Sequence, residues 1–279
     1  MNHTFKANQP IGIFDSGIGG LTVARAITKL LPNEQIIYFG DTAHMPYGEK
    51  SAEAIKHYSI KIADFLKFKN CKMIVIACNT ASAAAYKSVV KSTGMKDLVV
   101  NVIDPAVEYV VKNHFRQKVG VIATKRTISS NVYAKRIEAL DPVSDVVQLA
   151  TPLLAPMIEE GFYNNKISQT IINSYLSKSK LSKIDALILG CTHYPLIKTE
   201  IQKFYGKSVE IIDSSEIVAQ QVKVVLERNL LLNELQPSRF TFGKKSQFFV
   251  SDFTQSFEET SKIFFDEKVK LKQFNIWEE

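Results

Sequence analysis

The stretch IGIFDSGIGGLT at residues 11–22 decides the fold class. Its first four residues are suited to a buried strand, the next residues form a glycine-rich turn, and Leu21 opens an amphipathic run that suits a helix. Similar apolar runs recur along the chain and alternate with amphipathic segments. Strands that alternate with helices form mostly parallel sheets covered by helices. The stretch and its repeats therefore predict an α/β fold.

Eight runs are predicted as strands, because each is nearly continuously apolar, as expected of strands buried on both faces. They lie at residues 11–14, 36–39, 73–77, 98–103, 119–123, 146–149, 186–190 and 209–212. Helices are predicted where the apolar residues follow a helical period. The clearest of them lie at residues 21–31, 52–67, 131–140, 167–178 and 216–232.

The chain also repeats itself. The stretch at 11–22 aligns with VGVIATKRTISS at 119–130, and MIVIACNTASAA at 73–84 aligns with ALILGCTHYPLI at 186–197. Any two strand-helix units resemble each other to some degree, so chance similarity is the alternative reading. We predict two similar, doubly wound, mostly parallel-sheet domains related by pseudo-symmetry. The first takes residues 1–102 together with 213–279, and the second takes residues 103–212.

The composition excludes several classes of protein. With 46% apolar and 23% charged residues among 279, the chain is neither disordered nor a coiled-coil rod. Its longest apolar runs fall far short of the roughly 20 residues of a membrane span, so we expect no membrane partner. The start, MNHTFKANQP, lacks the apolar segment of a secretory signal and predicts a cytoplasmic location. The net charge of +7 is spread along the chain without interleaved aromatic residues, so we expect no nucleic-acid partner.

The three cysteines are Cys71, Cys78 and Cys191. They are odd in number and lack the paired spacing of a metal site, so neither a disulfide framework nor a bound metal is predicted. Cys71 is interpreted as a small buried apolar residue. Cys78 and Cys191 follow equivalent strands of the two halves, each at the start of a predicted helix, whose dipole favours a thiolate.

The polar residues that the strands leave unexplained follow their carboxyl ends, where parallel sheets bind ligands. Four loops carry them, at residues 15–20, 40–48, 78–80 and 191–195, and we predict that they meet in one cleft between the domains. The glycine-rich turn lacks the order of a dinucleotide site or a P-loop. It is either an anion site, with backbone N–H groups and the Ser16 hydroxyl facing a carboxylate, or simply a tight turn.

Two opposed thiols suit a reaction that has two faces. One thiolate removes the Cα proton of an amino acid from one face, while the other thiol delivers a proton to the opposite face. Asp15 and His193 are the neighbours that could adjust the two thiols. Such stereoinversion needs no cofactor, and none is predicted.

Four segments carry a family resemblance: GIFDSGIGGLTVAR, YFGDTAHMPYG, IACNTASA and LGCTHYPLI. They resemble those of the glutamate racemases, cofactor-independent enzymes that make D-glutamate for bacterial peptidoglycan. The resemblance implies two α/β domains with the active site between them, glutamate as the small-molecule substrate, and commonly a homodimer. By motif position, Cys78 and Cys191 would be the acid/base pair, assisted by Asp15 and His193 respectively. The residues that would hold the substrate, besides Asp15 and His193, are Ser16, Tyr47, Gly48, Asn79, Thr80 and Thr192.

Two alternatives stay open from the sequence. An aspartate or hydantoin racemase shares the two-thiol chemistry with a different substrate, although the THYPLI and DSGIGGLT segments favour glutamate. A non-catalytic binder, or a racemase homologue that inhibits another protein, would need neither thiol. Glu159 and Glu160 could face the cleft or end a solvated helix, and we leave both out of the predicted site.

Overall fold

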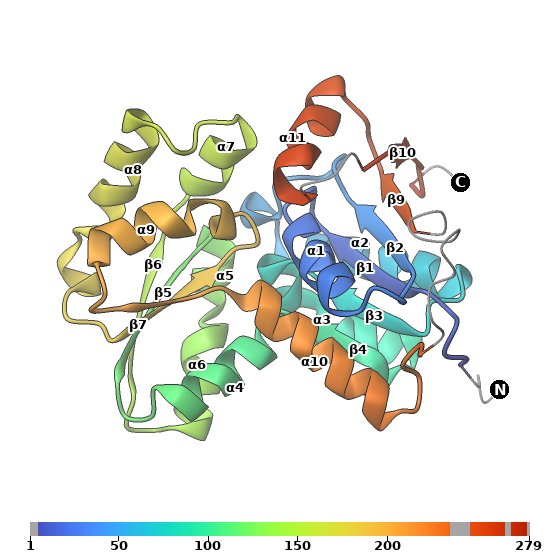
Figure 1. The fold of residues 1–279 in the computed structure, drawn as a ribbon, viewed down its shortest axis with the longest axis horizontal. Coiled ribbons are helices and arrows are strands. Elements are labelled where there is room, and N and C mark those ends of the chain that lie inside the picture. Colours follow the sequence, from blue (N-terminus) through green and yellow to red (C-terminus); the bar gives the residue numbers. More distant parts are fainter. Residues whose placement is uncertain (1–4, 235–245, 266–268, 278–279) are drawn as a thin grey trace.

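The computed structural model describes residues 5–234, 246–265 and 269–277, and it holds two separate parallel sheets (Figure 1). The first sheet has the order β10-β9-β2-β1-β3-β4 and the second has the order β6-β5-β7-β8. The strands of the first sheet are β1 (Ile11–Asp15), β2 (Ile36–Gly40), β3 (Met73–Ile76), β4 (Val99–Asn101), β9 (Gln247–Val250) and β10 (Leu271–Gln273). Those of the second are β5 (Lys118–Ala123), β6 (Asp145–Ala150), β7 (Ala186–Gly190) and β8 (Glu210–Ile212).

The predicted fold class is confirmed: the chain is an α/β protein with two sheets of parallel strands. Strands β2-β1-β3-β4 and β6-β5-β7-β8 follow the same order, in which the second strand precedes the first, third and fourth. All eight predicted strands are present. The sequence did not predict β9 and β10, which extend the first sheet beside β2. The domain limits proposed from the sequence stay a prediction.

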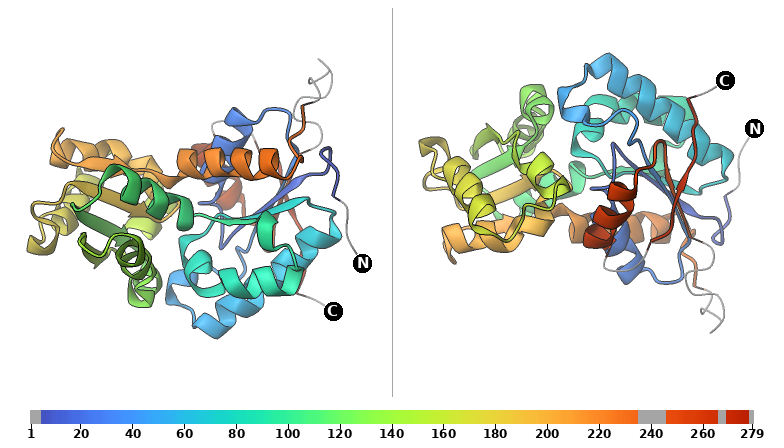
Figure 2. Two further views of the ribbon diagram at one scale, coloured as in Figure 1. Left: turned by 90° about the horizontal axis from the view of Figure 1, so that it is seen from below. Right: turned by 90° about the horizontal axis from the view of Figure 1, so that it is seen from above.

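Helices flank each sheet, and we call each sheet with its helices the first and second half of the molecule. The helices of the first half are α1 (Leu21–Leu30), α2 (Ala52–Phe68), α3 (Asn79–Thr93), α10 (Ser214–Arg228) and α11 (Gln255–Phe265). Those of the second are α4 (Asp104–Asn113), α5 (Lys125–Ser130), α6 (Val132–Leu140), α7 (Leu154–Glu159), α8 (Lys166–Leu176) and α9 (Lys198–Tyr205). Figure 2 shows the halves side by side, with α10 on one side of the first sheet and α2 and α3 on the other.

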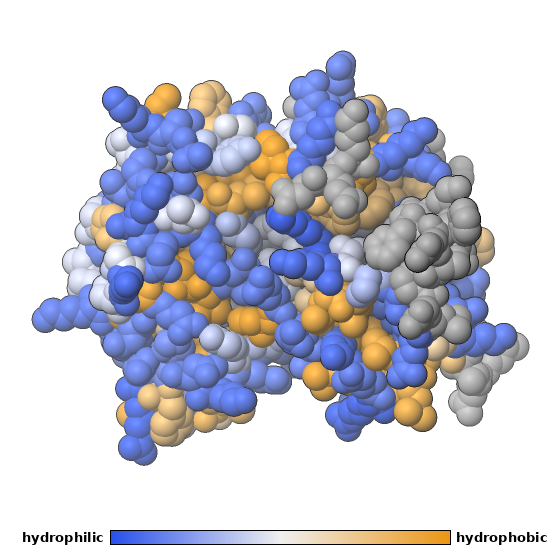
Figure 3. Space-filling view, viewed as in Figure 1, coloured by the Kyte–Doolittle hydropathy of each residue, from blue (hydrophilic) through white to orange (hydrophobic). Residues whose placement is uncertain are grey.

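The central strands are buried because helices cover both faces of each sheet. Every residue of β1, β2, β3 and β7 is buried, which explains why their sequences are continuously apolar instead of alternating. Figure 3 shows hydrophilic side chains over most of one face of the molecule. In the described part of the chain, no helix combines the length and the apolar character that crossing a bilayer requires. The predicted cytoplasmic location stays a prediction.

A buried ion pair between Lys72 and Glu34 connects three segments of the first half. Lys72 is fully buried, and its Nζ lies 2.6 Å from Glu34 Oε2 and donates to the Leu231 carbonyl at 2.8 Å. Glu34 Oε1 accepts from the Asn233 backbone N–H at 2.9 Å. The pair therefore ties the turn before β2 to the chain that leaves α10.

We expect Lys72→Met to lower the free energy of unfolding by about 3–5 kcal/mol, because it leaves the buried Glu34 carboxylate without its cation. Urea unfolding followed by circular dichroism measures the loss. The matched control adds Glu34→Gln, which removes the orphaned charge and still accepts from the Asn233 N–H, so it should regain part of the stability. A single-variant loss below about 1 kcal/mol would show that the pair behaves like an exposed one.

Candidate active site

A cavity of about 270 Å³ opens between the two halves, and residues at the ends of β1, β2, β3, β5 and β7 line it together with residues of α7. Nine of the residues predicted from the sequence lie in its wall: Ser16, Tyr47, Gly48, Cys78, Asn79, Thr80, Cys191, Thr192 and His193. Asp15 is buried behind the wall, where its carboxylate accepts from the Gly20 backbone N–H at 2.8 Å. The structure thus brings both thiols to one cavity. The roles that the sequence assigned to these residues stay predictions.

Cys78 ends the loop after β3 and caps helix α3. Its sulfur accepts from the Ala81 backbone N–H at 3.4 Å and donates to Ser16 Oγ at 3.6 Å. Burial and then the Asp15 carboxylate raise the pKa of this thiol to about 12, against the lowering effect of the helix N–H group. The sequence predicted that the helix dipole would favour a thiolate here. Burial of the sulfur is the larger effect, and it favours the neutral thiol.

A titration tests the raised pKa of Cys78. Burial penalises the charged thiolate, so its formation is expected only well above pH 9, the ordinary range of a thiol. In a Cys191→Ala variant the remaining thiols are Cys71 and Cys78, and burial raises the pKa of Cys71 to about 12 as well. Ultraviolet thiolate absorbance of this variant should therefore stay flat up to about pH 10. A full thiol equivalent that ionises near pH 9 would contradict the expectation.

The second thiol has an imidazole beside it. Cys191 Sγ lies 3.5 Å from His193 Nδ1, and His193 Nε2 lies 2.8 Å from Glu159 Oε1 in an ion pair that is not aligned as a hydrogen bond. Burial lowers the pKa of His193, but Cys191 and Glu159 outweigh it and raise that pKa well above its ordinary value. These two neighbours therefore favour the protonated form of the imidazole beside the Cys191 sulfur.

Two expectations for this side of the cavity need correction. The sequence placed Cys191 at the start of a helix, but the chain forms only a short 3-10 turn, Tyr194–Ile197, before α9 begins. The sequence also left Glu159 undecided, whereas the structure puts it at the end of α7, in the cavity wall and against His193. Nothing in the sequence joins Glu159 to His193, because one ends helix α7 and the other lies in the loop after β7.

The glycine-rich turn provides space for two site residues. A Cβ added to Gly19 would lie 2.4 Å from His193 Cε1, and one added to Gly20 would lie 2.6 Å from Asp15 Cβ. Neither glycine has a positive φ, so they are needed for close approach and not for an unusual backbone. The turn also brings Ser16 Oγ to the Cys78 sulfur. Its tight packing is therefore part of the site.

Hydroxyl groups join the two halves across the cavity floor. Thr80 Oγ1 lies 3.0 Å from Thr124 Oγ1, which caps α5, and Asn79 Oδ1 accepts from the Tyr133 hydroxyl at 2.6 Å. Thr124 also lines the cavity. The sequence analysis missed Thr124 although it follows β5, the strand equivalent to β1. The position after that strand was the available signal.

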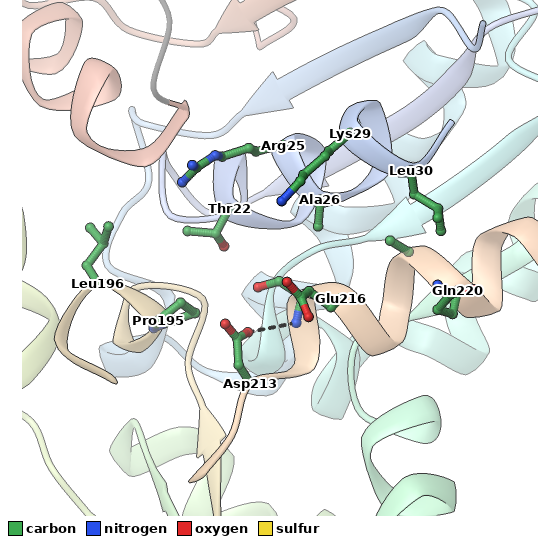
Figure 4. A pocket seen from close by; sticks show the side chains of 12 residues that line it. Thr22, Arg25, Ala26, Lys29, Leu30, Pro195, Leu196, Asp213, Glu216 and Gln220 are labelled. Atoms are coloured by element: carbon green, nitrogen blue, oxygen red, sulfur yellow. Dashed lines mark hydrogen bonds between the residues drawn. The ribbon is translucent and has the colours of Figure 1, made fainter. Parts of the chain in front are cut away.

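A larger hollow of about 450 Å³ lies elsewhere, between α1 and the start of α10 (Figure 4). Arg25 and Lys29 project from α1 toward it, and Asp213, which caps α10, and Glu216 line its other side. Among the described residues, no cysteine or histidine lines this larger hollow, so it lacks the predicted site residues. Thr22 separates the two cavities by donating to the Thr192 carbonyl at 3.0 Å.

In the described ranges, no group of three or more His, Cys, Asp or Glu side chains is arranged to hold a metal ion. The side chains in and behind the wall of the smaller cavity provide one thiol, one thiol beside an imidazole, a buried carboxyl group and several hydroxyl and amide groups.

The comparisons with known proteins agree with this geometry. The sequence profile of the family described as Asp/Glu/Hydantoin racemase matches residues 16–222. The chain is 40% identical over 268 residues to "Glutamate racemase 3" of Caldanaerobacter subterraneus subsp. tengcongensis, which covers 96% of this chain and 94% of that protein. It is 42% identical over 247 residues to the glutamate racemase of Geobacter metallireducens, and this match covers 88% of this chain and 89% of that protein.

A solved structure gives the same result. The crystal structure of glutamate racemase from Francisella tularensis subsp. tularensis SCHU S4 in complex with D-glutamate has a TM-score of 0.88 and 39% identity to this chain. The match covers 97% of this chain and 99% of that one. With two parallel sheets, two thiols in one cavity, and these matches over nearly its whole length, the chain belongs to the Asp/Glu/Hydantoin racemase family.

Proposed function

We propose that this protein is an amino-acid isomerase that interconverts L-glutamate and D-glutamate without a cofactor. The observation that carries the proposal is the presence of Cys78 and Cys191 in the wall of one cavity between the two halves. Removal and return of a Cα proton on opposite faces needs two such groups. The similarity to glutamate racemases, one of them solved with D-glutamate, supports glutamate as the substrate.

The two thiols have different surroundings. Burial favours the neutral form of Cys78, whereas the Cys191 sulfur lies 3.5 Å from His193 Nδ1. In one direction the Cys191 thiolate takes the Cα proton, and the Cys78 thiol gives its proton to the other face of the same carbon. The cycle leaves Cys191 as a thiol and Cys78 as a thiolate, which is the starting state for the reverse reaction.

Asp15 and His193 make the exchange of roles possible. Burial raises the pKa of Asp15, so this carboxyl group can share a proton with the neighbouring Cys78. His193 stands between Cys191 and Glu159 and can give or hold a proton at Nδ1. We therefore assign Asp15 to the Cys78 side and His193 to the Cys191 side.

The remaining wall residues would hold the substrate. We assign this role to the backbone and hydroxyl groups of Ser16, Tyr47, Gly48, Asn79, Thr80 and Thr192, which line the cavity. Buried polar groups without a partner fit a polar ligand. Within the described residues, Asn79 Nδ2 and Asp15 Oδ1 are buried and have no hydrogen-bond partner. An ammonium and a carboxylate of glutamate would satisfy such groups.

Incubation in deuterated water tests the proposal. L-glutamate should lose its Cα proton signal, and D-glutamate should form until the two enantiomers are equal. Retention of the proton would exclude the racemase and favour a non-catalytic binder. Faster exchange of L-aspartate than of L-glutamate would assign the chain to the other substrate of the family. The same rate after chelator treatment and dialysis is expected, and a requirement for added metal or pyridoxal phosphate would contradict the cofactor-independent reaction.

We also propose that the D-glutamate serves peptidoglycan synthesis and that the protein is a homodimer. Rescue of a bacterial strain that depends on external D-glutamate tests the first proposal. Sedimentation of the purified protein with and without glutamate tests the second.

A further inference from the structure

The loop that carries Tyr47 and Gly48 to the cavity is held from behind by the C-terminal part of the chain. We call residues 41–48, which follow β2, the Tyr47 loop. The Ala43 backbone N–H donates to Ser251 Oγ at 2.9 Å, and the Asp252 backbone N–H donates to Thr42 Oγ1 at 2.9 Å. The segment after β9 thus contacts the first residues of the loop.

Asp41 joins these contacts to the cavity wall. Its carboxylate is completely buried and accepts from the Tyr47 hydroxyl at 2.6 Å and from Ser251 Oγ at 2.9 Å. His44 Nδ1 lies 2.9 Å from the same carboxylate. The position of the Tyr47 ring therefore depends on the partners of Asp41, among them His44.

An aromatic cluster fixes His44 in turn. Its ring stacks on Tyr58 of α2 with the centroids 4.0 Å apart. The Trp277 ring packs edge-to-face with the His44 ring, with the centroids 4.5 Å apart. Trp277 also contacts Tyr58 at 5.4 Å, and Lys61 Nζ lies 5.5 Å from the Trp277 ring. Among the described residues none accepts a hydrogen bond from the buried Trp277 Nε1, so ring contacts and not a polar bond hold this side chain.

We propose that Trp277 and His44 are positioning residues for the substrate: Trp277 holds His44 on Asp41, and Asp41 holds Tyr47 in the cavity wall. The inference rests on the proposed function, since it assigns to the C-terminal segment a role in binding glutamate. Neither side chain lines the cavity, so both act through Tyr47. The thiols and their neighbours lie on other loops and keep their arrangement without Trp277.

The first test compares two aromatic residues of the C-terminal segment. Trp277→Ala should raise KM for both enantiomers of glutamate about 3- to 10-fold, the loss expected for aromatic ring contacts, while kcat changes little. The matched control is Phe274→Ala, which removes a ring that packs on Phe65 and Phe249 instead of on His44. It should leave KM unchanged. Equal effects of the two variants, or a fall in kcat at unchanged KM, would overturn the proposal.

Conservative and double variants separate positioning from folding. Trp277→Phe keeps an aromatic edge against His44 and should restore KM to near the parent value. His44→Ala should raise KM like Trp277→Ala, and the two together should raise it no further, because both break one chain of contacts. Full additivity would overturn the proposal. If circular dichroism shows that Trp277→Ala does not fold, the KM values of His44→Ala and Trp277→Phe still test the proposal.

The second test uses the fact that Trp277 is the one tryptophan of the sequence. Its fluorescence should change when racemic glutamate is added and should saturate near the concentration that equals KM, because substrate against Tyr47 shifts the contacts of His44. His44→Ala should abolish the change while the enzyme still turns over. If the parent enzyme is active but its fluorescence does not change with glutamate, this inference is wrong and the proposed function stands. If the parent enzyme does not turn over glutamate, the proposed function itself is wrong.

Discussion

Cys78→Ala is expected to lower racemisation of both enantiomers by about 10²- to 10⁴-fold, the contribution of one acid/base group, and Cys191→Ala is expected to do the same. Each thiol serves one face of the same carbon, so the cycle stops when either is missing. Polarimetry from L-glutamate and from D-glutamate measures the loss in both directions. The fold should persist, because both sulfurs lie at a cavity wall and not inside a sheet.

The third cysteine is the matched control. Cys71 is buried in the first half, where its sulfur would lie 3.0 Å from a Cβ added to Gly12 of β1, and it does not line the cavity. Cys71→Ala should cost some stability through the lost packing and leave the rate of racemisation close to that of the parent enzyme. Near-normal activity of the Cys78 or Cys191 variant in both directions would reject the two-thiol mechanism.

The sequence predicted the strands well because of how they are buried. Strands such as β1 and β7 lie between two layers of helices, so their residues are continuously apolar and easy to recognise. The strands β9 and β10 were missed because each contains exposed residues, so neither is a continuous buried apolar run. β9 joins the sheet by pairing with β2, and β10 by pairing with β9, and no local pattern encodes these contacts.

The site was predictable only where it follows strand ends. Cys78, Cys191 and their neighbours were found because parallel strands bring such loops together. Glu159 was left undecided because it enters from the end of a helix, and Asp41 was not selected because it reaches the cavity only through the Tyr47 hydroxyl. The N–H group at the start of α3 lowers the pKa of Cys78 in the direction that the sequence predicted, but a sequence does not show how deeply a sulfur is buried, and burial raises that pKa more.

Gly19→Ala is expected to lower kcat/KM by about 10²-fold, the cost of misplacing a reacting group by roughly 1 Å. The added Cβ would lie 2.4 Å from Cε1 and 2.5 Å from Nδ1 of His193. The imidazole has little freedom to move away, because Cys191 and Glu159 hold it on two sides and the Phe264 ring lies 5.3 Å from it. The added Cβ would therefore displace His193 Nδ1, the nitrogen that faces the Cys191 sulfur.

Gly17→Ala in the same turn separates this clash from a general effect of alanine. A Cβ at Gly17 meets only the flexible Met45 side chain, at 3.5 Å from Sδ, which is ordinary contact, so this variant should keep nearly full activity. Thermal unfolding of both variants shows whether Gly19→Ala retains its fold, with an overpacking cost of about 1–3 kcal/mol expected. Because His193 contacts the sulfur of Cys191 and not that of Cys78, the pKa of Cys78 should stay nearly the same in both variants by thiolate absorbance. Equal activity of the two alanine variants would mean that His193 is not held against Cys191 by the turn, and its assignment to that thiol would fail.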